Sequence, residues 1–232
     1  MLRALCASIQ RLCPESCPRC GFESDLGFCG DCRLDFPRIE SACPRCGLPL
    51  PCGPCPGSHR DWHIDAIHSP YVYGLPLARF LRDLKYRGQR RLGRALGLLL
   101  AAELKAAATG VDAIVGTPLH QRRLRARTFN QADEIALALA SHLRMPRLVS
   151  GIRRKLDTQP QTELNRKNRI ENPLRAFSVS RNLRGLRIAI VDDVITTGAT
   201  VNALADTLKS AGAIRVEAWS VARSVSFDLD RA

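Results

Sequence analysis

Apolar and polar positions follow two patterns along this chain, one typical of buried strands and one typical of amphipathic helices. Apolar runs predict strands at 111–115, 147–149, 187–191 and 214–222. Helical spacing of apolar residues predicts helices at 77–84, 91–108, 131–143 and 201–210. Asn130 is suited to cap the third of these helices. Strands that alternate with helices predict an α/β fold with a mainly parallel sheet and flanking helices.

The strand at 187–191 leads into the most informative motif of the chain. It is followed by two adjacent carboxylates, Asp192 and Asp193, and then by a Thr/Gly turn that opens a helix. A carboxylate only accepts hydrogen bonds, so the pair suits the two donors of a vicinal diol. Backbone N–H groups, hydroxyls and a helix N-terminus suit a phosphate. The residues predicted to hold that phosphate are Thr196, Thr197, Gly198, Ala199 and Thr200. The motif therefore predicts a site for a ribose 5-phosphate.

Two other segments fit the same site. The strand at 111–115 runs into a Gly/Thr turn and then arginines, which suits a pyrophosphate; the residues predicted there are Gly116, Thr117, Arg122 and Arg123. Solvated surface is the alternative for such an arginine-rich loop. Residues 153–173 lack apolar periodicity and predict a long, mobile loop. We interpret this loop as a lid that shields a reacting sugar from water, with a plain surface segment as the alternative.

The cysteines are confined to one end of the chain. All ten lie within the first 55 residues, and eight form the Cys-x-x-Cys pairs Cys17/Cys20, Cys29/Cys32, Cys43/Cys46 and Cys52/Cys55. In a reducing compartment this clustering favours metal over disulfides, and two such pairs complete a tetrahedral zinc site. We expect two structural zinc ions, one on the first two pairs and one on the last two. An interleaved pairing also satisfies the spacing, and Cys6 and Cys13 are expected to be spare thiols.

Composition narrows the class of protein. Apolar residues make up 45% of 232 residues, and the mean hydropathy of −0.11 is typical of a soluble globular protein. No apolar stretch is long enough to span a bilayer, and residues 1–13 lack a signal-like core, so we expect a cytoplasmic protein. The formal charge of +13 and the clustered arginines favour an anionic partner. A highly charged small substrate would explain one or two of these clusters, and nucleic acid would explain all of them.

The order of the motifs resembles one known family. The cysteine pairs are followed by Lys85-Tyr-Arg-Gly, Pro118-Leu-His-x-x-Arg, Phe129-Asn-Gln-Ala, Gln161-Thr-x-Leu-x-x-x-x-Arg, Asn172-Pro-Leu-Arg-Ala-Phe and Val191-Asp-Asp-Val-Ile-Thr-Thr-Gly-Ala-Thr. This series resembles the ComF family of bacterial competence proteins. The resemblance implies a double zinc ribbon over 1–58, a type I phosphoribosyltransferase domain over 59–232 and a role in natural transformation. It also implies that Asp192 and Asp193 face the ribose hydroxyls of phosphoribosyl pyrophosphate (PRPP), and that the loop at 196–200 cradles its 5-phosphate.

Four residues depart from the related patterns. Thr128 stands where the family usually has glycine, which predicts strain in that turn. Gly116 and Thr117 replace the usual Pro-Val of the pyrophosphate segment. Thr196 stands where purine-salvage relatives carry an aspartate base, and threonine cannot act as a base near neutral pH. Purine salvage is therefore not expected.

The leading hypothesis is an enzyme that binds PRPP with Mg²⁺ and transfers its phosphoribosyl group to an unknown acceptor, with Asp192 and Asp193 as catalytic residues. One rival is a module that binds single-stranded DNA or a DNA-uptake helicase. Its basic residues are present, but an aromatic content of 5% is low for base stacking. Another rival is a PRPP sensor without turnover.

Overall fold

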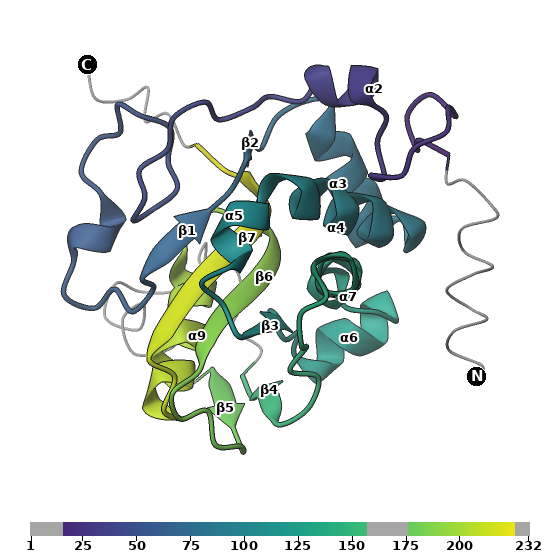
Figure 1. The fold of residues 1–232 in the computed structure, drawn as a ribbon. Coiled ribbons are helices and arrows are strands. Elements are labelled where there is room, and N and C mark those ends of the chain that lie inside the picture. The colour runs from purple at the N-terminus through teal and green to yellow at the C-terminus, as the bar shows by residue number, and fades with distance from the viewer. Residues whose placement is uncertain (1–15, 157–175, 226–232) are drawn as a thin grey trace.

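The computed structural model describes residues 16–156 and 176–225. At its centre lies a parallel sheet in the order β1-β7-β6-β3, with β2 beside β1 on the same edge of β7 (Figure 1). Its strands are β1 (Ala66–His68), β2 (Tyr71–Val72), β3 (Ala113–Gly116), β6 (Arg187–Ile195) and β7 (Arg215–Arg223). All of these pairings are parallel. The predicted α/β fold is therefore confirmed.

Helices lie on both faces of this sheet. The helices of the described residues are α2 (Gly30–Leu34), α3 (Leu77–Tyr86), α4 (Arg91–Glu103), α5 (Lys105–Ala108), α6 (Gln121–Arg127), α7 (Gln131–Leu143), α9 (Ala199–Ser210) and the 3₁₀ turn Pro56–Ser58. Helices α4 and α7 pack together against one face of the sheet, and α9 covers the other (Figure 1). An antiparallel pair, β4 (Ile152–Arg154) and β5 (Phe177–Val179), lies beside α9.

Strand β6 supplies apolar side chains to both faces. Ala189 and Val191 belong to the core beneath α4 and α7, whereas Ile188 and Ile190 belong to the core beneath α9. Successive side chains of a strand point to opposite faces, which explains this division. All four are fully buried, so the unbroken apolar run in the sequence is the signature of a strand covered on both sides.

The cysteine-rich segment packs against the helices of the α/β part. The Phe28 ring meets Phe36 and Phe80 edge to face, with centroids 5.0 and 5.1 Å apart, and Phe36 meets Tyr71 at 5.8 Å. Phe80 lies on α3 and Tyr71 on β2. Edge-to-face contacts of this kind add stabilisation beyond the area they bury. The aromatic cluster therefore joins the two parts through one continuous core.

A largely buried carboxylate strengthens the same junction. Glu103, the last residue of α4, accepts hydrogen bonds from Arg33 at 3.1 Å, Arg38 at 2.6 Å and the Tyr71 hydroxyl at 3.1 Å. Burial acts to raise the pKa of Glu103, but these three donors outweigh it and the pKa is lowered. Two cations from the cysteine-rich segment thus converge on one anion of the α/β part.

Several predicted elements differ from the observed ones. The single helix expected at 91–108 is two helices, because the buried Leu104 leaves helical geometry between α4 and α5. The strand expected at 147–149 is only one bridge, from Arg147 to Ile114. Residues 121–127 form α6 where a loop was expected, and 152–154 form β4 at the start of the predicted lid. The rest of that lid from 157, and Cys6 and Cys13, lie outside the described residues.

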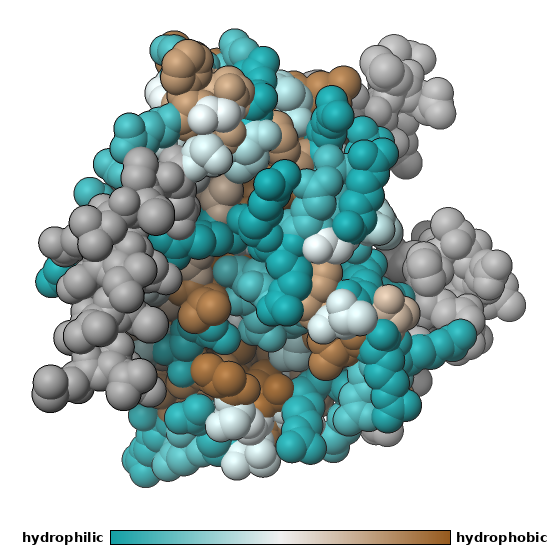
Figure 2. Space-filling view, turned by 90° about the vertical axis from the view of Figure 1, so that its right-hand side faces the viewer, coloured by the Kyte–Doolittle hydropathy of each residue, from teal (hydrophilic) through white to brown (hydrophobic). Residues whose placement is uncertain are grey.

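The side of the molecule that carries α4, α6 and α7 is largely hydrophilic, with apolar side chains in small patches (Figure 2). No helix in the described ranges is long and apolar enough to cross a bilayer.

The aromatic junction generates a stability prediction. Phe28 is 1% exposed and Phe22, on the same cysteine-rich segment, is 73% exposed. Phe28→Ala should lower the free energy of unfolding by about 3–5 kcal/mol, because it opens a cavity among the neighbouring rings. The matched Phe22→Ala should change it by about 0.5 kcal/mol or less. Urea unfolding followed by circular dichroism measures both, and equal losses would contradict the packing described.

Candidate functional site

The two aspartates of the motif lie inside β6, which continues to Ile195 instead of ending at Val191. Asp192 pairs in register with Ser220 of β7, and its Oδ1 accepts a hydrogen bond from the backbone N–H of Asp193 at 2.9 Å. The side chain of Asp193 is buried, and its Oδ2 lies 3.5 Å from Nζ of Lys85 on α3. The strand therefore holds both carboxylates rigidly at its carboxyl end.

The negative charge of the two carboxylates is only partly compensated by nearby cations. Burial raises the pKa of Asp192 well above its ordinary value, and repulsion from Asp193 raises it further. Lys85 acts in the opposite direction but does not cancel these effects. A ligand that brings a cation or hydroxyl donors would stabilise the ionised pair, because a carboxylate is held in its charged form by such partners.

The Thr/Gly turn that follows β6 forms the start of α9. Gly198 is its N-cap with a φ of 84°, in the left-handed region that favours glycine. The Thr197 hydroxyl accepts from the backbone N–H of Ala199 at 3.3 Å. Residues 194–201 and Asp192 surround a small hollow of about 60 Å³. Backbone N–H groups and hydroxyls at the first turn of this 12-residue helix make the hollow suitable for a tetrahedral anion.

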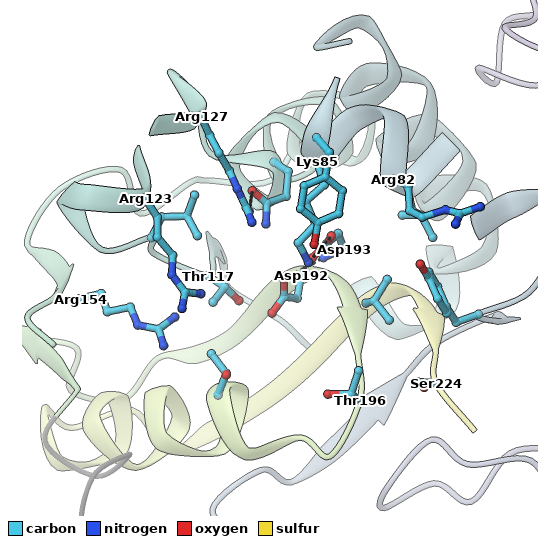
Figure 3. A pocket seen from close by; sticks show the side chains of 17 residues that line it. Arg82, Lys85, Thr117, Arg123, Arg127, Arg154, Asp192, Asp193, Thr196 and Ser224 are labelled. Carbon is cyan, nitrogen blue, oxygen red and sulfur yellow. Dashed lines mark hydrogen bonds and ion pairs between the residues drawn. The ribbon is translucent and has the colours of Figure 1, made fainter. Parts of the chain in front are cut away.

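A larger cleft of about 350 Å³ lies beside this hollow, between α3, α6 and the carboxyl ends of the strands. Both aspartates line it, together with Thr117, Thr196 and Thr200. Its basic side chains are Arg82, Lys85, Arg123, Arg127 and Arg154. Arg123 and Arg154 converge near Thr117, Arg127 points down from α6, and Arg82 points away to the α3 side (Figure 3). The cleft thus has a pair of carboxylates at its base and a basic wall, formed by these five side chains.

The predicted pyrophosphate residues are only partly brought together. Thr117 and Arg123 line the cleft, whereas Gly116 ends β3 against Asp133 and neither it nor Arg122 is part of the lining. The arginines lie on α6 and not on a flexible turn, because His120 caps this helix by accepting from the backbone N–H of Arg122 at 3.3 Å.

The turn at the end of α6 shows the strain that the sequence predicted. Thr128 has a φ of 65°, in the left-handed region where a β-branched residue is an outlier. Its backbone N–H donates to the carbonyl of Leu124 at 2.7 Å and closes the helix. The strained turn directs the chain into Asn130, which caps α7 as expected by accepting from the backbone N–H of Ala132 at 3.1 Å.

Sequence reasoning missed several residues of the cleft. Lys85 and Tyr86 lie on α3, Arg127 ends α6, and Gln131 begins α7. The guanidinium of Arg127 lies over the Tyr86 ring, 5.5 Å from its centroid. Lys85 and Tyr86 stand in the quoted Lys-Tyr-Arg-Gly string, so the signal was present, but helical spacing alone does not show that α3 faces β6.

The cysteines form two groups in the order expected for the sequential pairing. The sulfur atoms of Cys17, Cys20, Cys29 and Cys32 all lie within 4.8 Å of one another, as a closed four-thiolate zinc site requires. In the second group, Cys43, Cys46 and Cys55 meet the same limit, and Cys52 is outside it. Both groups fit a structural zinc ion, and Cys52 as the fourth ligand of the second group stays a prediction.

Comparison with known proteins agrees with this architecture. Residues 132–226 match the family model described as the phosphoribosyl transferase domain. The chain is 35% identical over 181 residues to DNA utilization protein YhgH of Salmonella typhi, covering 76% of this chain and 79% of that protein. It is 33% identical to competence protein F of Haemophilus influenzae, covering 75% and 78%. It is 27% identical to competence protein ComFC of Streptococcus pneumoniae, covering 94% and 84%.

Fold, motif and family model together define a protein of the phosphoribosyltransferase fold with an N-terminal pair of cysteine clusters. Sequence identity of 35% and 33% across more than three quarters of each relative also identifies the family. The chain belongs to the ComF family, together with competence protein F and DNA utilization protein YhgH.

The two cysteine groups generate a metal prediction. Elemental analysis of the purified protein should count two zinc ions per chain, because each group offers enough thiolates for one closed site. Cys20→Ser and Cys46→Ser should each leave one zinc. Cys52→Ser should also leave one; if it retains two, the fourth ligand of the second site is another residue. A wild-type count of one would refute the two-site assignment.

Proposed function

We propose that the protein binds PRPP with Mg²⁺ and transfers its phosphoribosyl group to an acceptor that is still to be identified. The observation that carries the proposal is the rigid Asp192/Asp193 pair directly before a helix-opening Thr/Gly loop, beneath a basic cleft of about 350 Å³. A diol acceptor and a phosphate site lie side by side there, as a ribose 5-phosphate needs. Clustered Cys-x-x-Cys pairs, which suit a metal better than disulfides, favour a cytoplasmic location for this activity.

Each part of the cleft has a role in this proposal. The loop at 196–200 holds the 5-phosphate through backbone N–H groups and hydroxyls. Asp192 and Asp193 accept hydrogen bonds from the ribose hydroxyls, and Lys85 keeps Asp193 oriented. Arg123 and Arg154 converge where the pyrophosphate would lie and select for substrates that carry that charge.

Magnesium fits the same residues. The raised pKa of Asp192 beside a second buried carboxylate is the situation that a divalent cation relieves. Asp192 and Asp193 would hold the ion together with the ligand, and when bound it supplies charge neutralisation for the departing pyrophosphate. Among the described residues that line the cleft, these two are the only carboxylates, and both are assigned to the ribose and the ion.

The proposal predicts the outcome of removing the carboxylates. Asp192→Asn and Asp193→Asn should each weaken Mg²⁺–PRPP binding and lower any pyrophosphate release by at least about 100-fold, because a neutral amide cannot replace the anion toward Mg²⁺. Isothermal titration calorimetry and a coupled pyrophosphate assay with nucleobase and amine acceptors measure both effects. Asp25→Asn, exposed on the cysteine-rich segment, removes the same charge and serves as control.

The outcomes of this experiment separate enzyme from sensor. Tight binding by the wild type without pyrophosphate release for any acceptor would favour the PRPP sensor. Undiminished turnover in the Asp192→Asn/Asp193→Asn double variant would refute the site itself.

A second candidate function is binding of single-stranded DNA, or of a helicase that handles it, along α6. This helix carries four arginines and no carboxylate among its 7 residues, and it borders a hydrophilic face (Figure 2). Tyr86, 70% exposed beneath Arg127, offers one ring for stacking. Two relatives carry the words DNA utilization and competence in their names. A basic helix beside an aromatic ring supports electrostatic binding of the nucleic-acid backbone with little sequence preference.

Salt dependence tests this second function. The affinity for a fluorescent oligothymidylate should fall steeply with salt, and Arg122→Gln/Arg125→Gln should reduce the slope of log K against log salt by about 0.7 for each phosphate that these arginines neutralise. Arg79→Gln/Arg91→Gln removes two exposed arginines from α3 and α4 as a matched control. A flat salt dependence in the wild type, or equal effects of both double variants, would contradict a DNA site on α6.

A further inference from the structure

One arginine lies between the second cysteine group and the loop at 196–200. Arg223 ends β7 and is 1% exposed, among the most deeply buried large side chains of the described residues. Its Nε donates to the carbonyl of Cys46 at 3.0 Å. Its Nη1 donates to the carbonyls of Ile195 at 2.9 Å and Thr196. A single guanidinium therefore binds a candidate metal-ligand residue and the first residue of the candidate phosphate loop.

No carboxylate of the described residues pairs with the charge of Arg223. Within 16–156 and 176–225, no salt bridge reaches this side chain, and its hydrogen bonds go to backbone carbonyls. A zinc ion held by three or four thiolates remains a net anion. The metal-loaded cluster is thus the natural counter-charge for the buried cation, since an isolated buried charge is costly.

The same cluster rests directly on the sheet. Gly47, one residue after Cys46, has a φ of 68°, and a Cβ there would lie 2.7 Å from Cγ2 of Ile67. Ile67 belongs to β1 and to the core that also contains Ile195, the last residue of β6. A shift of the Cys43–Gly47 turn would therefore be transmitted to the end of the strand that carries the two aspartates.

The chain that follows the cluster contacts the other side of the loop. The carboxamide of Asn202, in the first turn of α9, accepts from the backbone N–H of His63 and donates to the carbonyl of Asp61, both at 2.7 Å. Between them, Trp62 packs so closely on Gly198 that a Cβ there would lie 2.7 Å from the indole ring. Arg223 and the segment Asp61–His63 thus hold the loop from two directions.

We propose that Arg223 is a positioning residue through which the metal state of the second cysteine cluster sets the affinity of the loop at 196–200 for the phosphate of its ligand. The part that concerns the ligand rests on the proposed PRPP site. Loss of the metal removes the counter-charge of Arg223 and frees the Cys46 carbonyl to move. The Ile195 and Thr196 carbonyls then lose their fixed donor, and the N–H groups of the loop lose their alignment.

Thermodynamic linkage makes the coupling reciprocal. If zinc at the second cluster strengthens PRPP binding by some factor, PRPP must strengthen zinc binding there by the same factor. In a protein that stays folded in both metal states, a side chain that merely stabilised the fold would not link these two ligands. Reciprocity is therefore the readout that separates positioning from general stabilisation.

The first experiment compares the two clusters in the full chain. Cys43→Ser should weaken PRPP binding on the order of tenfold, more than Cys20→Ser, which disrupts the cluster that packs beside α3 and α4. Hydrogen exchange should rise at residues 195–202 in Cys43→Ser and not in Cys20→Ser. Equal weakening and equal exchange in the two variants would overturn the coupling.

The second experiment tests Arg223 itself. Arg223→Met should lower the affinity for PRPP. In chelator competition, it should lower the affinity of one zinc ion and leave that of the other unchanged. Saturating PRPP should no longer change the zinc affinity of this variant. Arg223→Lys, which keeps the charge, should recover part of both affinities. Arg215→Met at the start of the same strand, where the side chain binds Glu217 at 2.8 Å, is the control. Unaltered PRPP–zinc reciprocity in Arg223→Met would refute the proposal.

The two proposals fail in distinguishable ways. If the wild type does not bind PRPP, the proposed function fails, and hydrogen exchange at 195–202 in Cys43→Ser and Arg223→Met still decides whether the cluster controls the loop. If the wild type binds PRPP and exchange in that segment is unchanged in both variants, the proposed function stands and the coupling is refuted.

Discussion

The constraint on which the structure depends is the burial of β6 between β3 and β7. Parallel pairing on both edges and helices on both faces bury the middle of this strand, from Ile188 to Val191, completely. Both aspartates therefore emerge at its carboxyl end, already oriented by the sheet. The cost is a crowded carboxylate pair with a raised pKa at Asp192, and Lys85 relieves it only in part. A site with negative charge that is only partly compensated is suited to a cationic or diol-bearing ligand.

Much of this could be predicted because the relevant signals are local. The cap at Asn130, the apolar run before Asp192 and the helix that ends at Ser210 all depend on near neighbours in the chain. The extension of β6 past Asp193 could not be read in the same way, because two carboxylates interrupt the apolar run and the pairing of Val194 and Ile195 with β7 continues the strand. Strands β1 and β2 are too short to show any period.

The residues of the candidate site likewise fall into those that local sequence predicts and those that depend on tertiary contacts. Residues on the strand–turn–helix motif were found from sequence because one stretch of chain contains them all. The basic wall was located less well: α6 has charge but no apolar stripe, and its helical form depends on the His120 cap and the strained Thr128 turn. Lys85, Arg127 and Arg223 contact residues that are far from them in the sequence. Such contacts depend on tertiary packing and cannot be predicted from a short stretch of sequence.

The pairing of β7 with β1 and β2 also bears on synthesis at the ribosome. The two early strands emerge long before residues 215–223, with which both of them pair. The cysteine groups, in contrast, have their ligands within a short stretch near the start of the chain. The side chains of both cysteine groups thus leave the ribosome well before the sheet can be completed. A product truncated ahead of β7 would keep its cysteine pairs and lack both the strand that pairs with β1 and β2 and the Arg223 hydrogen bond to Cys46.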